Sequence, residues 1–169
     1  RPVRRAPKVY ILFNKPRDIL CTCRDPQGRR TFQEFVKVPQ GRLYPVGRLD
    51  RDSEGLLLLT NDGEFAQQLT HPRHAVAKRY QAWLARPVGD DALARMVAGV
   101  ESEGERLAVD SIAPVASADA RPCYDIVLHT GRNRQIRRMF AALGCDLLRL
   151  KRLAVGPDRR ELGPRLGDG

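Results

Sequence analysis

The apolar segments of this chain are short, and their length constrains the fold more than any other feature of the sequence. The longest uninterrupted apolar runs, Val9 to Phe13 and Leu56 to Leu59, have the length of single β-strands. No run approaches the roughly 20 apolar residues that a membrane-spanning helix needs. Strand-like and helix-like segments are mixed without a regular strand–helix–strand repeat, which favours an α+β fold over a doubly wound parallel sheet.

Further strands are expected where apolar, β-branched and aromatic residues cluster between turn signals. These segments are 55–60, 78–85, 107–115, 124–128 and 147–150. In the segment 78–85 the residues Tyr80, Ala82 and Leu84 lie on one side. A loop is expected over 41–49, because this segment contains Gly and Pro.

Helices are expected at 64–69, after the turn Asn61-Asp62-Gly63, and at 90–98, before Gly99. The segment 31–36 predicts a further short helix. The clearest helix covers 135–143, where one apolar stripe is followed by Gly144, a favourable residue for ending a helix. The stripe consists of Ile136, Met139, Phe140 and Leu143.

The chain carries a net charge of +10, because 30 Lys and Arg residues outnumber 20 Asp and Glu residues. An excess of this size on a small domain indicates a polyanionic partner. The segments 1–30 and 132–152 are basic, whereas 90–125 holds eight acidic and three basic residues. We therefore expect a basic face or cleft with the acidic segment pointing elsewhere. A solvated surface without a partner is the plainer interpretation.

The four cysteines, Cys21, Cys23, Cys123 and Cys145, match neither a zinc site nor a secreted disulfide framework. Reduced thiols in a cytoplasm are therefore expected, and the amino terminus does not have the pattern of a signal peptide. His71 and His74 are close in sequence, but nothing nearby completes a metal site. A helix-end or surface position is the favoured interpretation of both histidines.

The first segment that is dense in chemical groups is Gly47-Arg48-Leu49-Asp50-Arg51-Asp52-Ser53-Glu54-Gly55. In an extended loop its acids Asp50, Asp52 and Glu54 share one face, which suits a Mg²⁺ site in a metal-dependent nuclease. Alternatively, one acid is the working group and the others cap turns or pair with arginine. An ordinary acidic surface loop is the plainest interpretation of any one of them.

The second dense segment, 130–138, carries four arginines at a predicted strand–helix junction. Arg134, Arg137 and Arg138 point off the apolar stripe of the helix, and such a cluster can clamp phosphates. Arg137 adjoins the stripe and is therefore the arginine that we expect to be drawn inward, which requires an acid partner from elsewhere in the chain. A solvated basic helix face is the competing interpretation.

The chain resembles the RNA pseudouridine synthases, in the branch that acts on small-subunit and large-subunit ribosomal RNA, because it contains four of that family's segments in the same order. The matching segments are Leu12-Phe13-Asn14-Lys15-Pro16, 47–57, Lys78-Arg79-Tyr80 and 131–139. The sequence most resembles the large-subunit enzyme that lacks a separate amino-terminal RNA-binding domain. The resemblance implies the fold of that catalytic domain over residues 1–156, a mixed, mainly antiparallel central sheet flanked by helices. Residues 157–169 are expected to form a flexible tail.

The resemblance implies isomerisation of a specific uridine in ribosomal RNA, in the 23S molecule, without cofactor or metal. The family breaks the bond between C1′ and N1, turns the base and rejoins it through C5. Asp50 matches the family's essential aspartate, which acts as nucleophile or as electrostatic and proton-transfer partner. Arg137 matches the arginine that pairs with this aspartate, the counter-charge that a carboxylate in a dry pocket needs. Tyr80 matches the aromatic residue beside the base, although a core tyrosine is the plainer interpretation.

The resemblance also implies which residues contact the RNA. Arg48 matches an arginine that fills the space left by the flipped base, and Leu150 resembles the apolar residue under the base, with ordinary strand packing as the alternative. Phosphate contacts are expected from Lys15, Arg132, Arg134 and the cluster 1–5. Asp52 and Glu54 are expected to be structural. We expect a cytoplasmic monomer, with a non-catalytic RNA-binding module of the ribosome as the alternative function.

Overall fold

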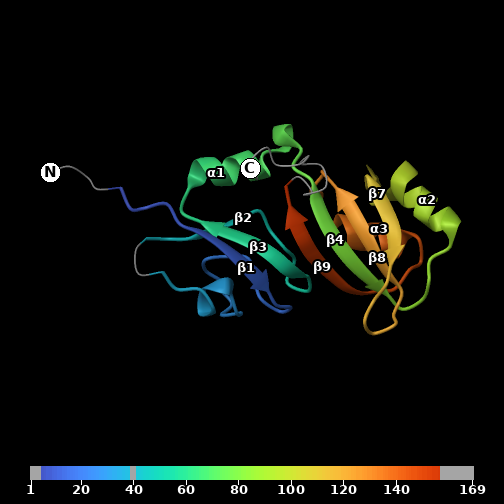
Figure 1. The fold of residues 1–169 in the computed structure, drawn as a ribbon, viewed down its shortest axis with the longest axis horizontal. Coiled ribbons are helices and arrows are strands. Elements are labelled where there is room, and N and C mark those ends of the chain that lie inside the picture. Colours follow the sequence, from blue (N-terminus) through green and yellow to red (C-terminus); the bar gives the residue numbers. More distant parts are fainter. Residues whose placement is uncertain (1–4, 39–40, 157–169) are drawn as a thin grey trace, which may run out of the picture. The chain divides into compact units, whose positions relative to one another are not determined.

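The computed structural model describes residues 5–38 and 41–156, which form two compact units (Figure 1). The first unit ends at His74 and the second begins at Ala75. Three α-helices and mainly antiparallel strands make up the described elements, which confirms the predicted α+β class. The predicted tail, 157–169, lies outside the described residues, as do residues 1–4 of the basic cluster. The predicted extent of the catalytic domain, 1–156, stays a prediction.

In the first unit the strand β3 (Glu54–Thr60) has two antiparallel partners. β1 (Tyr10–Lys15) lies along its full length, with Lys15 opposite Gly55, and β2 (Tyr44–Val46) pairs with its last residues. Leu57 and Leu59 of β3 are fully buried, as expected for an apolar strand with an inward face. The segment 41–49 therefore contains a short strand, not only the predicted loop.

The predicted turn at 61–63 starts the helix α1 (Gly63–Thr70), because the Asp62 carboxylate accepts a hydrogen bond from the backbone N–H of Phe65 at 3.3 Å. Two one-turn 3₁₀ helices, η1 (Phe32–Glu34) and η2 (Pro72–His74), complete the unit. η1 is the short helix predicted over 31–36, and it buries Phe32.

The second unit contains an antiparallel sheet in the order β9-β4-β8-β7. Its strands are β4 (Lys78–Leu84), β7 (Ser111–Val115), β8 (Cys123–Leu128) and β9 (Leu147–Val155). β5 (Val100–Ser102) and β6 (Glu105–Leu107) form a separate hairpin. The helix α2 (Asp90–Ala98) packs against β7, and α3 (Gln135–Ala142) packs against β5 and β9.

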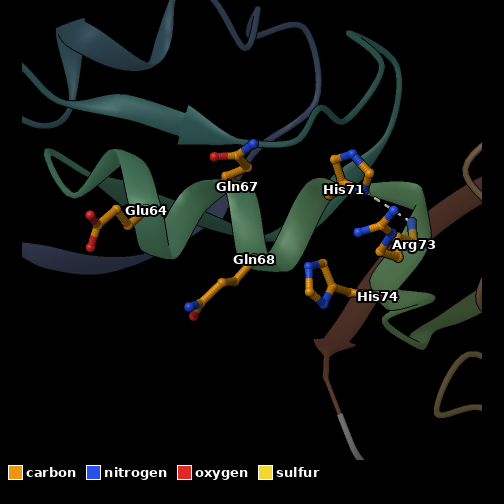
Figure 2. A pocket seen from close by; sticks show the side chains of 6 residues that line it. All are labelled: Glu64, Gln67, Gln68, His71, Arg73 and His74. Atoms are coloured by element: carbon orange, nitrogen blue, oxygen red, sulfur yellow. Dashed lines mark hydrogen bonds between the residues drawn. The ribbon is translucent and has the colours of Figure 1, made fainter.

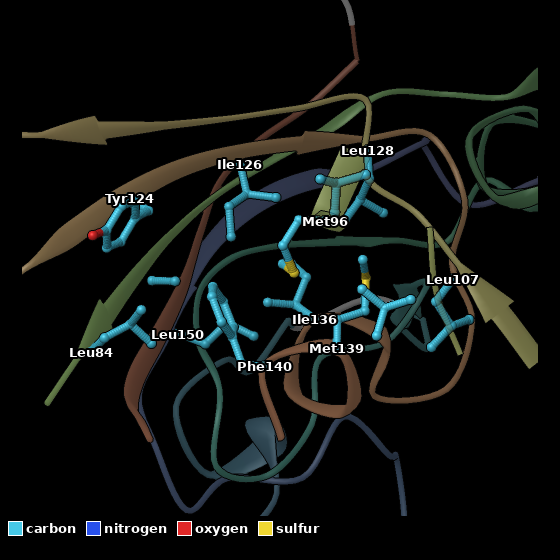
Figure 3. Close-up of a cluster of buried hydrophobic side chains, with 13 residues drawn as sticks. Leu84, Met96, Leu107, Tyr124, Ile126, Leu128, Ile136, Met139, Phe140 and Leu150 are labelled. Carbon is cyan, nitrogen blue, oxygen red and sulfur yellow. The ribbon is translucent and has the colours of Figure 1, made fainter. Parts of the chain in front are cut away.

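One face of this sheet and the two helices enclose the main hydrophobic core of the second unit (Figure 3). The sheet contributes alternate residues, such as Leu84 of β4 and Ile126 of β8, and α2 contributes Met96. The predicted stripe of α3 is confirmed: Ile136, Met139 and Phe140 are buried and Leu143 packs at the edge of the core. Gly144 follows with φ +71°, the left-handed conformation that ends many helices.

The prediction of a single strand over 107–115 is wrong. The chain leaves the β5–β6 hairpin at Leu107 and joins the large sheet only at Ser111. Between these points the backbone N–H of Val109 bonds the carbonyl of Met96 at 3.0 Å, and the N–H of Asp110 bonds the carbonyl of Val127 at 2.8 Å. The strand predicted at 147–150 is longer than expected, because β9 continues to Val155.

Candidate functional site

Asp50 lies on a loop of the first unit that is fixed at several points. Leu49 before it is buried, and its backbone N–H points to the Cys21 sulfur at 3.4 Å. After it, a tight turn brings the backbone N–H of the buried Ser53 to the Asp50 carbonyl at 3.1 Å. The Asp50 side chain is half-buried, whereas Arg48 is exposed on the same loop. Buried residues on both sides therefore fix the backbone that carries this carboxylate.

Lys15, the last residue of β1, stabilises the same loop through its side chain. Its side chain is fully buried, and its Nζ donates to the carbonyls of Pro16 at 2.9 Å, Ile19 at 2.8 Å and Arg51 at 3.3 Å. Burial lowers the pKa of Lys15, and the nearby Cys21 thiol and the carboxylates of Asp18, Asp50 and Asp52 oppose this shift. All three donors are thus occupied by backbone oxygens. The predicted phosphate contact of Lys15 is wrong, because the ammonium is inaccessible and serves the loop of Asp50.

Tyr80 and Leu150 lie on the core side of the sheet in the second unit. Tyr80 is half-buried in β4, between Ile126 of β8 and Arg152 of β9, and it packs against the main core. Leu150 of β9 is opposite Ala82 and belongs to the core itself, with 5% of its surface exposed. The structure therefore favours the packing interpretation of Leu150 over the predicted contact with the base.

No role was predicted for Gln135, yet its side chain holds Thr130 and Arg132, two residues of the basic segment just before α3, in place. Its side chain is buried, its Oε1 accepts from the Thr130 hydroxyl at 2.9 Å and from the Arg132 N–H at 3.3 Å, and its Nε2 donates to the Ala108 carbonyl at 2.8 Å. Arg134 caps the helix in the left-handed conformation, with φ +49°. The sequence signal for such a contact is an amide residue at the first position of the predicted helix, a few residues after the hydroxyl of Thr130.

The arginines of this segment have different environments. Arg132 and Arg134 are exposed, and Arg137 is half-buried on α3. The side chain of Arg138 is only 14% exposed, and its guanidinium reaches Glu105 at 2.7 Å and the Ser102 carbonyl at 2.8 Å. Arg132 also contacts Glu105, at 3.2 Å. The prediction that the acidic segment points away from the basic one is therefore wrong for the β5–β6 hairpin.

His71 and His74 lie at the carboxyl end of α1, where they line a shallow polar hollow with Arg73 and three residues of the helix (Figure 2). Both histidines are exposed, as predicted, and the His71 Nδ1 accepts from the backbone N–H of Arg73 at 3.1 Å. Within residues 5–38 and 41–156, no three His, Cys, Asp or Glu side chains are placed to hold a metal ion.

Each unit brings together part of the predicted set. The first unit holds Lys15, Arg48 and Asp50: Arg48 and Asp50 lie on one anchored loop, and Lys15 of β1 donates to the carbonyl of Arg51 on that loop. The second unit holds Tyr80 and Leu150 on the sheet, and Arg132, Arg134 and Arg137 at the start of α3. Among the described helices, none has the length and apolar composition needed to cross a bilayer.

Comparison with known proteins identifies the family. A family model described as RNA pseudouridylate synthase matches residues 9–142. The ribosomal large subunit pseudouridine synthase B of Bacillus subtilis is 42% identical over 154 residues, which cover 89% of this chain and 62% of the relative. An uncharacterized RNA pseudouridine synthase of Aquifex aeolicus is 40% identical over 158 residues, covering 93% of this chain and 64% of the relative.

A solved structure described as a pseudouridylate synthase superimposes with a TM-score of 0.76 at 32% identity, over 90% of this chain and 64% of that chain. The chain therefore belongs to the RNA pseudouridylate synthase family, and the predicted resemblance is confirmed at this level. It spans less than two thirds of the length of the two curated relatives. The predicted lack of a separate amino-terminal RNA-binding domain stays a prediction.

Proposed function

We propose that this protein converts a specific uridine of large-subunit 23S ribosomal RNA into pseudouridine. The observation that carries the proposal is the family match over residues 9–142, which contains Asp50, Tyr80 and Arg137. The name of the Bacillus subtilis relative, a large-subunit enzyme, supports the choice of the RNA. The anchored loop of Asp50 adds a physical argument, since a catalytic carboxylate must be held in a fixed geometry.

In the proposed reaction the bond between C1′ and N1 of the uridine breaks and a bond between C1′ and C5 forms. C5 loses a proton and N1 gains one, so the reaction needs proton transfer but no net oxidation, reduction or hydrolysis. We assign Asp50 to the sugar, as nucleophile or as electrostatic and proton-transfer partner. Tyr80 is assigned to the base, where a phenol can stack on the uracil and relay a proton at C5.

Arg137 is proposed as the counter-charge of Asp50. A carboxylate that is shielded from water by a bound nucleotide stays ionised only when a positive group or several hydrogen bonds compensate for the lost hydration. Arg137 suits this role because it is half-buried on α3 beside the core residue Ile136. A guanidinium keeps its charge at all physiological pH values.

RNA binding is proposed to rest on the exposed basic residues. The target base must leave the stack, which costs a few kcal/mol, and we assign Arg48 to the space that it vacates. Arg132 and Arg134 are exposed and are assigned to phosphates. The protein is proposed to act as a cytoplasmic monomer, without cofactor or metal.

The direct test maps pseudouridine in ribosomal RNA from cells with and without this gene. The proposal predicts that a single site, or a small group of neighbouring sites, in 23S rRNA loses its modification and regains it when the gene is restored. An unchanged modification map would contradict the proposal. Binding of the RNA together with an unchanged map would favour a non-catalytic RNA-binding module.

A further inference from the structure

Glu105 contacts two arginines, Arg132 before α3 and Arg138 within its first turn and a half. Its Oε2 accepts from the Arg138 guanidinium at 2.7 Å, and its Oε1 accepts from the Arg132 guanidinium at 3.2 Å. Glu105 is the first residue of β6, so the β5–β6 hairpin holds this carboxylate beside the arginines. The carboxylate therefore occupies Arg132, which the proposed function assigns to RNA phosphate.

The two contacts of Glu105 differ in strength. Arg138 is 14% exposed and is also fixed by the Ser102 carbonyl at 2.8 Å and by Glu103 at 3.3 Å. Arg132 is 65% exposed, and its guanidinium contacts Glu105 at 3.2 Å. An exposed pair of this kind contributes little to stability. The contact with Arg132 can therefore open while Glu105 stays bound to Arg138.

The charge on Glu105 persists at neutral pH. The hydrogen bond from Arg138, together with the positive charges of Arg138 and Arg132, lowers the pKa of the carboxyl. A carboxylate and a phosphodiester offer arginine the same kind of partner, an anionic group with two acceptor oxygens. The two anions thus compete for one guanidinium.

We propose that Glu105 is an internal competitor of RNA phosphate at Arg132. In the free protein Arg132 rests on Glu105, and when RNA binds, a phosphate oxygen replaces the carboxylate while Glu105 keeps its bond to Arg138. The inference rests on the proposed function, because it requires RNA as the ligand of the basic segment. It predicts that Glu105 weakens RNA affinity and thereby helps the product to dissociate.

The test measures binding of a fluorescein-labelled RNA stem-loop with a uridine-rich loop, at an ionic strength of about 0.15 M, where charges beyond about 8 Å are screened. Glu105→Gln is expected to tighten binding about two- to fivefold, the range set by the strength of exposed ion pairs. In the Arg132→Ala background, Glu105→Gln is expected to cause no tightening. Tightening that persists without Arg132, or no tightening in the wild-type background, would overturn the inference.

Two matched variants separate this effect from the loss of a negative charge. Glu101→Gln removes the same charge from the same hairpin, but Glu101 lies near Arg106, at 3.8 Å. Glu103→Gln removes a contact of Arg138 but none of those that the structure gives to Arg132. Both are expected to change RNA affinity less than Glu105→Gln does. An equal tightening by either variant would contradict the competition at Arg132.

A measurement on the unmodified protein keeps the inference testable if Glu105→Gln does not fold. In side-chain NMR spectra, RNA is expected to shift the guanidinium signals of Arg132 and to leave those of Arg138 in place. Unmoved Arg132 signals on RNA binding would overturn the inference. A pseudouridine assay on the same wild-type sample tests the proposed function separately, because RNA affinity and turnover are independent readouts.

Discussion

At the scale of single residues, Lys15 shows how a correct motif can carry a wrong role. A lysine after a strand in a basic chain suggests a phosphate contact. The alternation of the strand argues against such a contact. Successive residues of a strand point to opposite sides, so Lys15 points to the same inward side of β1 as Ile11 and Phe13. The structure buries its ammonium among three carbonyls, one of which belongs to the loop of Asp50.

Lys15→Met tests this structural role. The substitution keeps the length of the side chain but leaves three carbonyls, the buried one of Ile19 among them, without their charged donor, so the free energy of unfolding is expected to fall by about 1–3 kcal/mol. Chemical denaturation measures the change, with the exposed Lys37→Met as control. If Lys15 contacted RNA instead, the variant would keep its stability and lose only RNA affinity.

Arg137→Ala tests the proposed counter-charge. We expect slower isomerisation together with a lower melting temperature, because the variant leaves the proposed partner carboxylate without compensation. Removal of one partner costs about 3–5 kcal/mol in a fully buried pair, and less where the arginine is half-buried, as here. Arg95→Ala on the exposed side of α2 is the control. A variant with wild-type melting temperature and wild-type turnover would remove Arg137 from the site.

At the scale of elements, the sequence predicts which side of a strand is buried better than it predicts which strand lies beside it. Leu107 and Val109 are buried and Ala108 between them is exposed, so the alternation over 107–109 indicates an inward side, which does not continue in register to Ser111. Yet Leu107 pairs with Val100 in the hairpin, whereas Ser111 pairs with Val127 in the large sheet. Alternation reports which side of a strand is buried, and it contains no information about the neighbouring strand. The α3 helix was predictable because its stripe and its terminal glycine are local signals.

The N-terminal cap of α1 predicts an acid-sensitive contribution to stability. Asp62 accepts from the Tyr10 hydroxyl at 2.6 Å and from the Lys8 ammonium at 3.0 Å, and these hydrogen bonds lower its pKa from 3.8 to about 2. Between these two values the unfolded chain binds more protons than the folded one, so the free energy of unfolding falls as the pH falls from about 4 to about 2.

Asp62→Asn is expected to flatten this acid limb, because asparagine still caps the helix but does not titrate. Thermal unfolding measured between about pH 2 and pH 5 gives the comparison. Glu64→Gln, in the exposed first turn of the same helix, is expected to retain the wild-type slope. An unchanged slope in Asp62→Asn would show that the contacts of Asp62 do not contribute to the pH dependence.

At the scale of the whole molecule, the net charge of +10 correctly indicated the kind of partner that the family acts on, but not how the charges are arranged. Glu103 and Glu105 face the arginines that the sequence placed apart from them. Such ion pairs form between residues that are distant in sequence, so no local sequence pattern predicts them.

Treatment with EDTA is expected to leave pseudouridine formation unchanged on a short RNA substrate that folds without divalent ions. The proposed reaction moves protons and one glycosidic bond, and within 5–38 and 41–156 no cluster of side chains is arranged to hold a metal. Release of tritium from RNA that is labelled at C5 of uridine measures turnover before and after chelation, because C5 loses its proton in the proposed reaction. A loss of turnover that added Mg²⁺ restores would return the metal-dependent alternative to consideration.

The central claim is that the Asp50 carboxylate carries out the isomerisation, and Asp50→Asn tests it most directly. The amide has nearly the same shape but has no charge and cannot act as the nucleophile. We predict that the variant binds RNA with wild-type affinity and forms pseudouridine more than about a thousandfold more slowly, the scale of loss expected for an essential catalytic group. Turnover within about tenfold of the wild type would contradict the claim.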